Sequence, residues 1–190
     1  MDEQIEILPL LKLNLDEILP IITGYESYEK YLVEKYESDM QTIFTIRLVQ
    51  LKEPYQKTFE EDFNNDEDFQ RYTSFLSQGY SFGAYDHHRL VIFAISEAQP
   101  WNRSLQVWEF HVKKDYRRKG IGKALMGKVV SKAIQDQFRI ISLETQNTNL
   151  NAIRFYRSVG FSLEALDLSL YTNHDLDAGE VAFFMKMKLE

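Results

Sequence analysis

A short basic turn between two apolar segments carries the residue types and spacing that best suit a chemical role. The stretch YRRKGIGKAL, from Tyr116 to Leu125, holds four cationic side chains and two glycines one residue apart. If a strand ends before it and a helix begins within it, its backbone N–H groups and the helix dipole face one spot. Such a turn is an anion cradle, and phosphate is the ligand that we expect. A helix with a loose N-terminus is the other interpretation.

Two familiar phosphate motifs do not match this glycine spacing. A P-loop requires Gly-Lys followed by Ser or Thr, whereas Gly122-Lys123 is followed by Ala124. A dinucleotide-binding fingerprint requires a third glycine at position 125, which is Leu125. The turn therefore belongs to neither class of nucleotide-binding loop.

The segments around the turn predict strands and helices that hold it in place. From Tyr80 onward, YSFGAYD, LVIFAISEA and SLQVWEFHV read as three strands joined by turns at DHHR and QPWNR, which predicts an antiparallel meander. After the glycines, apolar residues recur every fourth position, which predicts an amphipathic helix. These positions are Ile121, Leu125, Val129 and Ala133.

The last third of the chain continues the alternation of strands and helices. We expect a strand over 138–146, a capped helix in NTNLNAIRFYRSVGF that ends at Gly160, and strands in FSLEALDLSLY and EVAFFMKMKL. This order predicts an α/β fold, layered in the α+β manner, with a mixed central sheet and helices on both faces.

The first third has weaker patterns. Asn14 is a candidate helix cap before Asp16, and TIFTIRLVQL at 42–51 predicts a strand closed by Pro54. EEDFNNDEDF at 60–69 places six acidic residues between Glu60 and Asp68. It is either a solvated loop before a helix in FQRYTSFLSQG or a lip that recruits cations.

Charge divides unevenly along the chain, whose net charge is -7. Residues 1–100 hold 19 acidic and 8 basic residues, whereas residues 101–190 hold 10 acidic and 14 basic residues. This asymmetry suggests one cationic and one anionic ligand, unless it reflects scattered surface charges alone. The acidic balance argues against a nucleic-acid partner.

Composition also bears on the compartment and on metals. No apolar run approaches the length of a membrane span, and the N-terminus is acidic, so we expect a cytoplasmic protein with no membrane partner. The chain has no cysteine, which excludes disulfides and thiolate chemistry. His87 and His88 fall in a tight turn and are expected in solvent, and no metal site is expected.

Two motifs in sequence order resemble the GNAT superfamily of acetyl-CoA-dependent N-acetyltransferases. The family's turn, Arg/Gln-x-x-Gly-x-Gly/Ala, matches Arg117, Gly120 and Gly122. A second family motif, Asn-x-x-Ala-x-x-Phe/Leu-Tyr-x-x-x-Gly-Phe, matches the segment from Asn149 to Phe161. LETQNTN, SLYTN and VAFFMKMKL further resemble the streptothricin acetyltransferase group of antibiotic-modifying enzymes.

The resemblance implies one GNAT domain over residues 1–190, with the motif-bearing core in 80–190 and substrate-side elements in 1–79. It implies transfer of an acetyl group from acetyl-CoA to a primary amine. In the family the pantetheine arm lies along the strand before the turn, which implies main-chain contacts at Phe110, His111 and Val112, and a contact from Asn149. The resemblance assigns the pyrophosphate to Arg117, Arg118, Lys119, Gly120, Ile121, Gly122 and Lys123.

The same resemblance implies the acid and the base of the reaction. Tyr156 matches the family's general acid, unless it packs the helix on the sheet, a role that suits Phe155 better. Glu109 is the favoured base, and alternation places it on the face of Leu105, Val107 and His111, opposite Trp108 and Phe110. His111 and Glu144 are the next candidates for the base.

Two residues remain for the substrate. Glu144 is expected to hold the substrate's ammonium if it is not the base, and Tyr171 is either a second proton donor or a core tyrosine. The favoured acceptor is a small cationic amine, such as a streptothricin-like antibiotic. A protein N-terminus or lysine, or a non-catalytic acetyl-CoA-binding module, remains the alternative. GNAT proteins often form dimers, so a homodimer is a further expectation.

Overall fold

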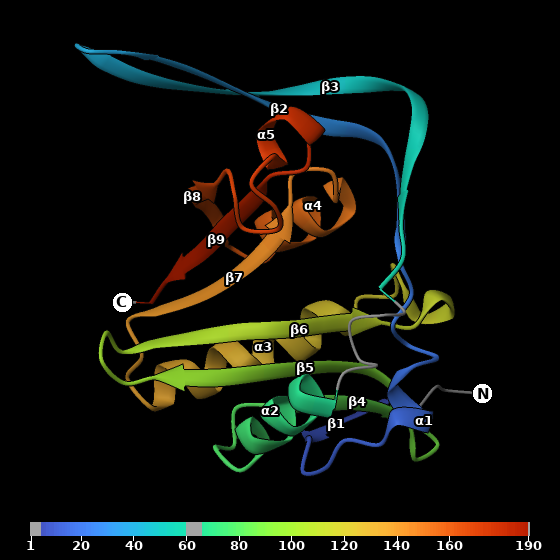
Figure 1. Ribbon diagram of the computed structural model, residues 1–190. Coiled ribbons are helices and arrows are strands. Elements are labelled where there is room, and N and C mark those ends of the chain that lie inside the picture. Colours follow the sequence, from blue (N-terminus) through green and yellow to red (C-terminus); the bar gives the residue numbers. More distant parts are fainter. Residues whose placement is uncertain (1–4, 60–65, 190) are drawn as a thin grey trace. The chain divides into compact units, whose positions relative to one another are not determined.

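The computed structural model describes residues 5–59 and 66–189, which form two compact units (Figure 1). Unit 1 comprises residues 5–24, 58–59, 66–143 and 187–189, and unit 2 comprises Tyr25–Lys57 and Glu144–Lys186. The strand β7 (Ile140–Gln146) contributes its first residues to unit 1 and its last residues to unit 2. The prediction of a single domain over 1–190 stays a prediction.

Unit 1 is built on the predicted meander. The strands β4 (Phe82–Asp86), β5 (Arg89–Gln99) and β6 (Ser104–Val112) pair antiparallel in sequence order. β1 (Ile5–Pro9), which the sequence did not predict, adds to β4, and β7 runs parallel to β6. The sheet is therefore mixed, as expected.

The turn between β4 and β5 confirms the role predicted for its two histidines. His87 and His88 have φ angles of 46° and 63°. A two-residue hairpin of the type that matches strand twist needs positive φ at both central residues. The pair therefore closes the hairpin.

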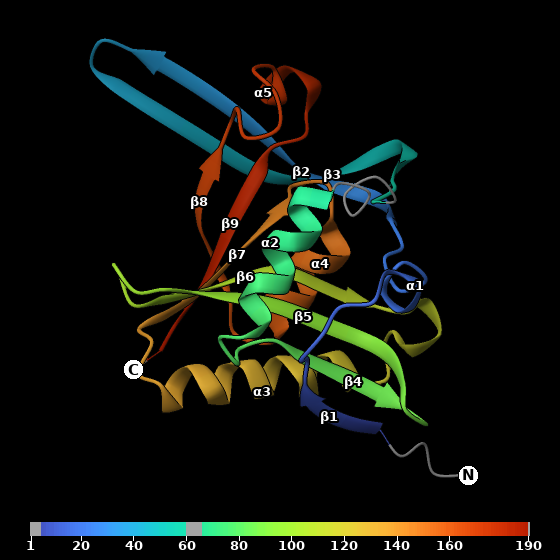
Figure 2. The ribbon, with the colours of Figure 1, turned by 60° about the horizontal axis from the view of Figure 1, so that its bottom comes forward.

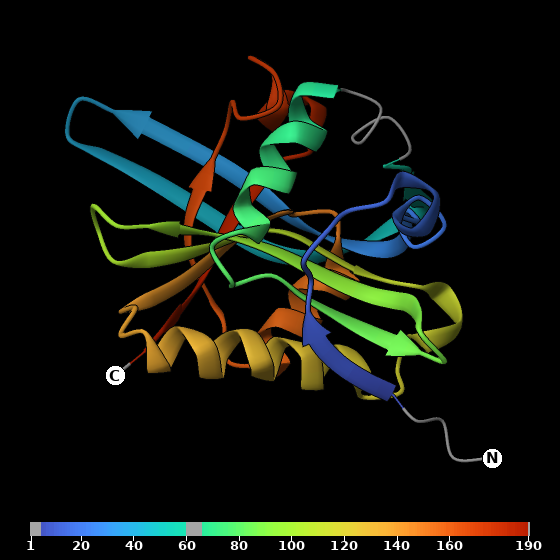
Figure 3. The same ribbon diagram turned by 90° about the horizontal axis from the view of Figure 1, so that it is seen from below.

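Helices cover both faces of this sheet, as predicted. α2 (Asp66–Leu76) crosses one face, and α3 (Ile121–Gln135) lies along the other (Figures 2 and 3). Successive side chains of β5 point to opposite faces of the sheet. Phe93 and Ile95 join the apolar cluster that includes Phe75 of α2, whereas the alternate residues Ile92 and Ala94 are buried but do not belong to that cluster. The buried stripe of α3 comprises Leu125, Met126, Val129 and Ala133.

The short helix α1 (Leu15–Ile18) begins where the sequence predicted. Asn14 is its N-cap, and the Asn14 side chain accepts a hydrogen bond from the N–H of Asp16 at 3.0 Å. The acidic stretch from Glu60 to Asp68 is only partly described, because residues 60–65 lie outside the described residues. Its last three acidic residues form the beginning of α2. No helix in the described ranges is long and apolar enough to cross a membrane.

Unit 2 contains a long hairpin of β2 (Tyr25–Ser38) and β3 (Gln41–Lys57). The prediction that Pro54 closes the strand at 42–51 is wrong, because β3 continues to Lys57. The register runs from Gln50 opposite Glu29 to Tyr55 opposite Ser27, so Pro54 lies in an irregular stretch between them. A proline is tolerated there because it removes no ladder hydrogen bond.

The rest of unit 2 follows the predicted order. α4 (Leu150–Ser158) begins at the N-cap Asn149, and Gly160 follows it with a φ of 105°. β8 (Ser162–Asp167) pairs antiparallel with β9 (Ala182–Lys188). β8 ends before the predicted boundary, and a short helix, α5 (Asp175–Ala178), lies in the polar loop between the two strands.

One buried amide joins three segments of unit 2. Asn147 is 1% exposed, and its Nδ2 donates to the carbonyl oxygens of Tyr31 at 2.7 Å and Gly179 at 3.3 Å. Its Oδ1 accepts from the N–H of Val181 at 2.8 Å. The side chain thus satisfies backbone groups of Tyr31, in β2, and of Gly179 and Val181, which lie just before β9.

We predict that Asn147→Ala lowers the free energy of unfolding by about 3 kcal/mol, because it leaves the Val181 N–H and the Tyr31 carbonyl without their partner. Urea unfolding followed by circular dichroism measures this loss. Asn151→Ala is the matched control, since Asn151 is exposed and makes one long hydrogen bond, to the carbonyl of Glu26 at 3.3 Å. Equal stability of the two variants would contradict the assignment.

Candidate active site

The basic turn lies between the end of β6 and the start of α3, as the sequence predicted. A 3₁₀ turn, η1 (Lys114–Tyr116), follows β6, and Gly120 is the N-cap of α3 with a φ of 82°. This left-handed backbone favours glycine, and a Cβ at Gly120 would point into open space. Arg118 also has a positive φ, of 61°. The chain therefore reverses through two left-handed residues before the helix begins.

The first turn of α3 offers donors to an anion. The N–H groups that begin a helix have no intrahelical acceptor, and here they belong to Ile121, Gly122 and Lys123. Neither a side-chain cap nor an acidic residue of the first turn competes for them. The exposed side chains of Arg118 and Lys123 add positive charge. These features fit a diphosphate group such as the pyrophosphate of acetyl-CoA.

Arg117 contributes to the turn in a way that the sequence did not reveal. Its Nε donates to the carbonyl oxygen of Val112 at 3.1 Å, and its second guanidinium nitrogen donates to Oγ1 of Thr23 at 2.6 Å. Its backbone N–H donates to the carbonyl of Lys114. Arg117 thus fastens the turn to the end of β6, and its predicted contact with pyrophosphate stays a prediction.

β6 continues past its pairing with β7. The parallel ladder between them joins Ser104–Val107 to Ile140–Leu143 and ends there, whereas β6 runs on along β5 to Val112. The predicted pantetheine-binding residues Phe110, His111 and Val112 all lie in this extension.

An irregularity in β6 changes which way its side chains point. Ile95 pairs with Glu109, but Ser96 pairs with Val107, so Trp108 is an extra residue in β6. The prediction that Trp108 lies opposite Glu109 is wrong. The Trp108 ring stacks on Phe75 of α2 at 6.4 Å between centroids, while Glu109 contacts Tyr72 of the same helix. Strict alternation fails because the extra residue shifts the register by one.

Two of the predicted bases contact each other in unit 1. Nε2 of His111 lies 2.7 Å from Oε2 of Glu109, and both side chains are partly buried. Tyr72 hydrogen-bonds to Glu109, and burial, together with the charge of Glu109, raises the pKa of the Tyr72 hydroxyl. That hydroxyl therefore stays protonated at neutral pH and donates to the carboxylate.

The α4 motif residues have structural contacts of their own. Asn149 accepts a hydrogen bond from the N–H of Ala152 at 3.2 Å, so its side chain caps the helix. Tyr156 is 8% exposed and lies against the rings of Phe155 and Phe161. Phe155 is less buried than Tyr156, so the structure does not bear out the expectation that Phe155 packs the helix in its place.

The two predicted substrate residues meet in unit 2. The Tyr171 hydroxyl donates to Oε1 of Glu144, which lies near the end of β7. Burial and the charge of Glu144 raise the pKa of Tyr171, so this hydroxyl is a donor at neutral pH. The pair is a polar, half-buried site.

A second carboxylate, Glu180, enlarges this site. Glu180 accepts a hydrogen bond from the Tyr55 hydroxyl at 2.9 Å and forms an ion pair with Lys57. The Lys57 ammonium lies 5.1 Å from the centroid of the Tyr171 ring. Burial and Glu180 raise the pKa of Tyr55 to about 12. We call Glu144, Tyr171, Glu180, Tyr55 and Lys57 the tyrosine–carboxylate cluster.

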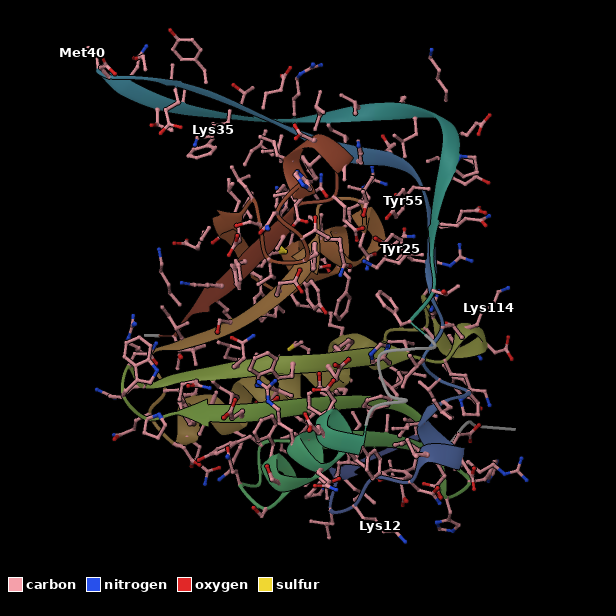
Figure 4. The ribbon with its side chains drawn as sticks, in the orientation of Figure 1. Lys12, Tyr25, Lys35, Met40, Tyr55 and Lys114 are labelled. Carbon is pink, nitrogen blue, oxygen red and sulfur yellow. The ribbon has the colours of Figure 1, made fainter. Side chains whose placement is uncertain are left out.

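Further residues border the tyrosine–carboxylate cluster. Tyr25 stacks on Tyr55 at 6.2 Å between ring centroids, and Figure 4 labels both at the end of the hairpin remote from Met40. Asp175, 2% exposed, accepts the N–H of Tyr171 at 2.8 Å and both the N–H and hydroxyl of Thr172 at 2.7 Å. Asp175 therefore fixes the loop that carries Tyr171.

Sequence reasoning missed several of these residues. Tyr72, Glu180 and Tyr55 belong to no motif, and their partners are distant in sequence. Asp175 also belongs to no motif, although its partners Tyr171 and Thr172 lie close to it in the chain. The sequence gives one indication of Tyr25 and Tyr55, because tyrosines and acidic residues are interspersed in the first third of the chain, where both lie. That indication does not say which tyrosine meets which acid.

The chain matches the family model described as the acetyltransferase (GNAT) family over residues 40–161. It is 32% identical over 147 residues to streptothricin acetyltransferase A of Bacillus subtilis (strain 168), which covers 77% of this chain and 80% of that protein. It is 35% identical over 98 residues to the streptothricin acetyltransferase of Streptomyces lavendulae, covering 52% of this chain and 51% of that protein.

Solved structures share the fold over nearly the whole chain. The crystal structure of nourseothricin acetyltransferase has a TM-score of 0.72 and 26% identity, covering 98% of this chain and 99% of that one. An acetyltransferase of Bacillus anthracis str. Ames, solved in complex with acetyl coenzyme A, has a TM-score of 0.75 and 22% identity, with coverage of 98% and 99%. At that identity the second likeness shows the fold alone.

The family match and the basic turn at the start of α3 agree with each other. The expected resemblance to the GNAT superfamily, and within it to the streptothricin acetyltransferase group, is confirmed. The chain belongs to the acetyltransferase (GNAT) family and is an acetyl-CoA-dependent N-acetyltransferase.

Proposed function

We propose that this enzyme acetylates a primary amine of a streptothricin-type antibiotic, a cationic molecule that bears a β-lysine. Two curated relatives are named streptothricin acetyltransferases, and a solved relative is named nourseothricin acetyltransferase. The observation that carries the proposal is the tyrosine–carboxylate cluster of unit 2. It combines two carboxylates with tyrosine rings and hydroxyls, the groups that bind an aliphatic ammonium.

Lys57 illustrates the chemistry of this cluster. Its primary ammonium pairs with Glu180 and lies over the Tyr171 ring. A β-lysine ammonium makes the same kinds of contact. The two carboxylates, Glu144 and Glu180, both contribute negative charge to the cluster, which favours the binding of an ammonium group. Glu144, a half-buried carboxylate that accepts a hydrogen bond from the Tyr171 hydroxyl, is the residue that we assign to the substrate.

In unit 1 we assign acetyl-CoA to the basic turn and to the end of β6. Acetyl-CoA supplies an acetyl thioester. The N–H groups of Ile121, Gly122 and Lys123 bind the pyrophosphate, and the left-handed Gly120 keeps the approach open. The remaining residues of unit 1 that we assign to acetyl-CoA are Phe110, His111, Val112, Arg117, Arg118 and Lys119. In unit 2, the family motif assigns Asn149 and Tyr156 to acetyl-CoA.

Acid–base chemistry completes the proposal. An ammonium cannot attack a thioester, so a base must take its proton. Glu109 suits this role, and its contact with His111 offers a place to pass the proton on. Tyr72 orients the Glu109 carboxylate. Tyr156 is assigned as the acid that protonates the departing thiolate.

The first of three predictions that test this proposed function concerns the reaction itself. The purified protein is expected to release thiol from acetyl-CoA with streptothricin and not with aminoglycosides, polyamines or peptides with free N-termini. Tyr156→Phe is expected to lower kcat roughly 100-fold, because a general acid is lost, and to affect acetyl-CoA affinity far less, because the aromatic ring remains. Tyr36→Phe, at an exposed hairpin position, is the control. Turnover with peptides alone would refute the streptothricin assignment.

The second prediction concerns the ammonium site. Glu144→Gln and Tyr171→Phe should each raise the KM for streptothricin about tenfold, which corresponds to ~1.4 kcal/mol of lost binding. The KM for acetyl-CoA should stay the same. Glu53→Gln, at an exposed position of β3, serves as the matched control. An unchanged KM for streptothricin in both variants would remove these residues from the site.

The third prediction concerns the basic turn. Gly120→Asn should weaken acetyl-CoA binding at least tenfold in calorimetry, since asparagine tolerates positive φ and yet fills the space above the turn. Gly127→Ala in the same helix also adds a methyl group into open space and should leave affinity unchanged. If both variants bind acetyl-CoA equally well, the pyrophosphate does not lie at Gly120.

A further inference from the structure

The β2–β3 hairpin presents an edge that no strand covers. Within the described residues it forms a separate two-stranded sheet. Its two-residue loop, at Asp39 and Met40, lies at the end of the hairpin labelled by Met40 in Figure 4. A long two-stranded sheet with an uncovered edge is a template for pairing with another strand.

The register shows which backbone groups point outward from β3. Ser38 and Gln41 flank the two-residue loop and form the first hydrogen-bonded pair, after which hydrogen-bonded and non-hydrogen-bonded pairs alternate. Tyr31 and Leu48 then form a non-hydrogen-bonded pair. The Tyr31 N–H accordingly bonds outward, to the carbonyl of Asn147 at 3.0 Å. By the same count, the N–H and C=O groups of Phe44, Ile46 and Leu48 point to the outer edge of β3.

The two outer edges of the hairpin differ. The edge of β2 is occupied at Tyr31, where Asn147 bonds both the N–H and the carbonyl. β2 also carries five charged residues between Glu29 and Glu37, which discourage pairing. β3 has a single charged residue, Arg47, between Gln41 and Leu51. The edge of β3 is therefore both unprotected by charge and uncovered within the described residues.

Apolar side chains accompany this edge. Phe44, Ile46 and Leu48 share one face of β3, and Phe44 and Leu48 are 45% and 44% exposed. On the opposite face, Ile43 is 44% exposed. Exposed aromatic and β-branched residues in a row stabilise a sheet when they pair across strands.

We propose that β3 pairs antiparallel with β3 of a second copy, centred on Ile46. In this register Ile46 lies opposite Ile46 of the second copy, and Phe44 lies opposite Leu48. Arg47 lies opposite Thr45, so no like charges face each other. A two-fold axis relates identical strands in this arrangement, and the outward backbone groups of both copies satisfy each other.

The difference between the two edges limits the assembly to a dimer. Continued growth of the sheet needs a second uncovered edge on each copy. β2 does not supply one, because Asn147 holds its edge at Tyr31. The expected product is one four-stranded sheet, in the order β2-β3-β3-β2, rather than a fibre.

A cysteine cross-link tests the register, and the chain contains no cysteine that would interfere. In Ile46→Cys the two Cα atoms are about 5.5 Å apart, within the range for a disulfide. In Gln50→Cys the equivalent atoms are roughly 27 Å apart. Mild oxidation should give a cross-linked dimer with Ile46→Cys and little with Gln50→Cys. No cross-link at Ile46, or equal cross-linking at both positions, would overturn the proposal.

Sedimentation velocity tests the interface without a covalent bond. The wild-type protein should sediment with twice the chain mass, and Phe44→Lys/Leu48→Lys should sediment as a monomer. When the Phe44→Lys/Leu48→Lys variant is mixed with a Phe44→Glu/Leu48→Glu variant, the opposite charges should restore a dimer. A restored dimer would also show that both variants are folded. Tyr36→Lys, on β2, is the control and should stay dimeric. A monomeric wild-type protein, or no dimer in the mixture, would overturn the proposal.

Discussion

The backbone hydrogen bonding of β6 is the constraint on which the geometry of unit 1 depends. β6 pairs with β7 only up to Val107, and it continues to Val112 along β5. The extra residue, Trp108, shifts the register, so Trp108 and Glu109 both reach α2. Arg117 then ties the end of the strand to the basic turn. A local irregularity thus places the assigned base and the assigned phosphate site along one continuous segment.

In unit 2, two buried polar side chains make hydrogen bonds to backbone N–H and carbonyl groups of neighbouring segments. Asn147 bonds the edge of β2 and the start of β9, and Asp175 bonds the loop that carries Tyr171. Both side chains are almost fully buried, so their hydrogen bonds form where water does not compete. They hold in place the backbone segments that carry Tyr171 and precede β9. The same Asn147 contact leaves β3 as the one edge of the hairpin suited to a second copy.

Much of the fold was predictable because its signals are local. The meander, the helix after the glycines and the helix capped by Asn149 follow from periodicity and capping residues close in sequence. The strands β1 and β2 were not predicted. In β2, tyrosines and acids alternate with few apolar residues, because only part of that strand is buried. The end of β3 was misplaced because the irregular register that accommodates Pro54 depends on the partner strand.

The sequence by itself determined the family, the basic turn and the amphipathic elements that flank it. Each of these depends on residues within one turn or strand of each other, where backbone geometry follows from residue type. The tertiary structure alone decided that Glu109 meets His111 and Tyr72, that Glu144 meets Tyr171, and that Arg117 bonds Val112 rather than pointing to solvent. Such contacts depend on register shifts and on side chains brought together from distant segments, and neither is encoded in local spacing.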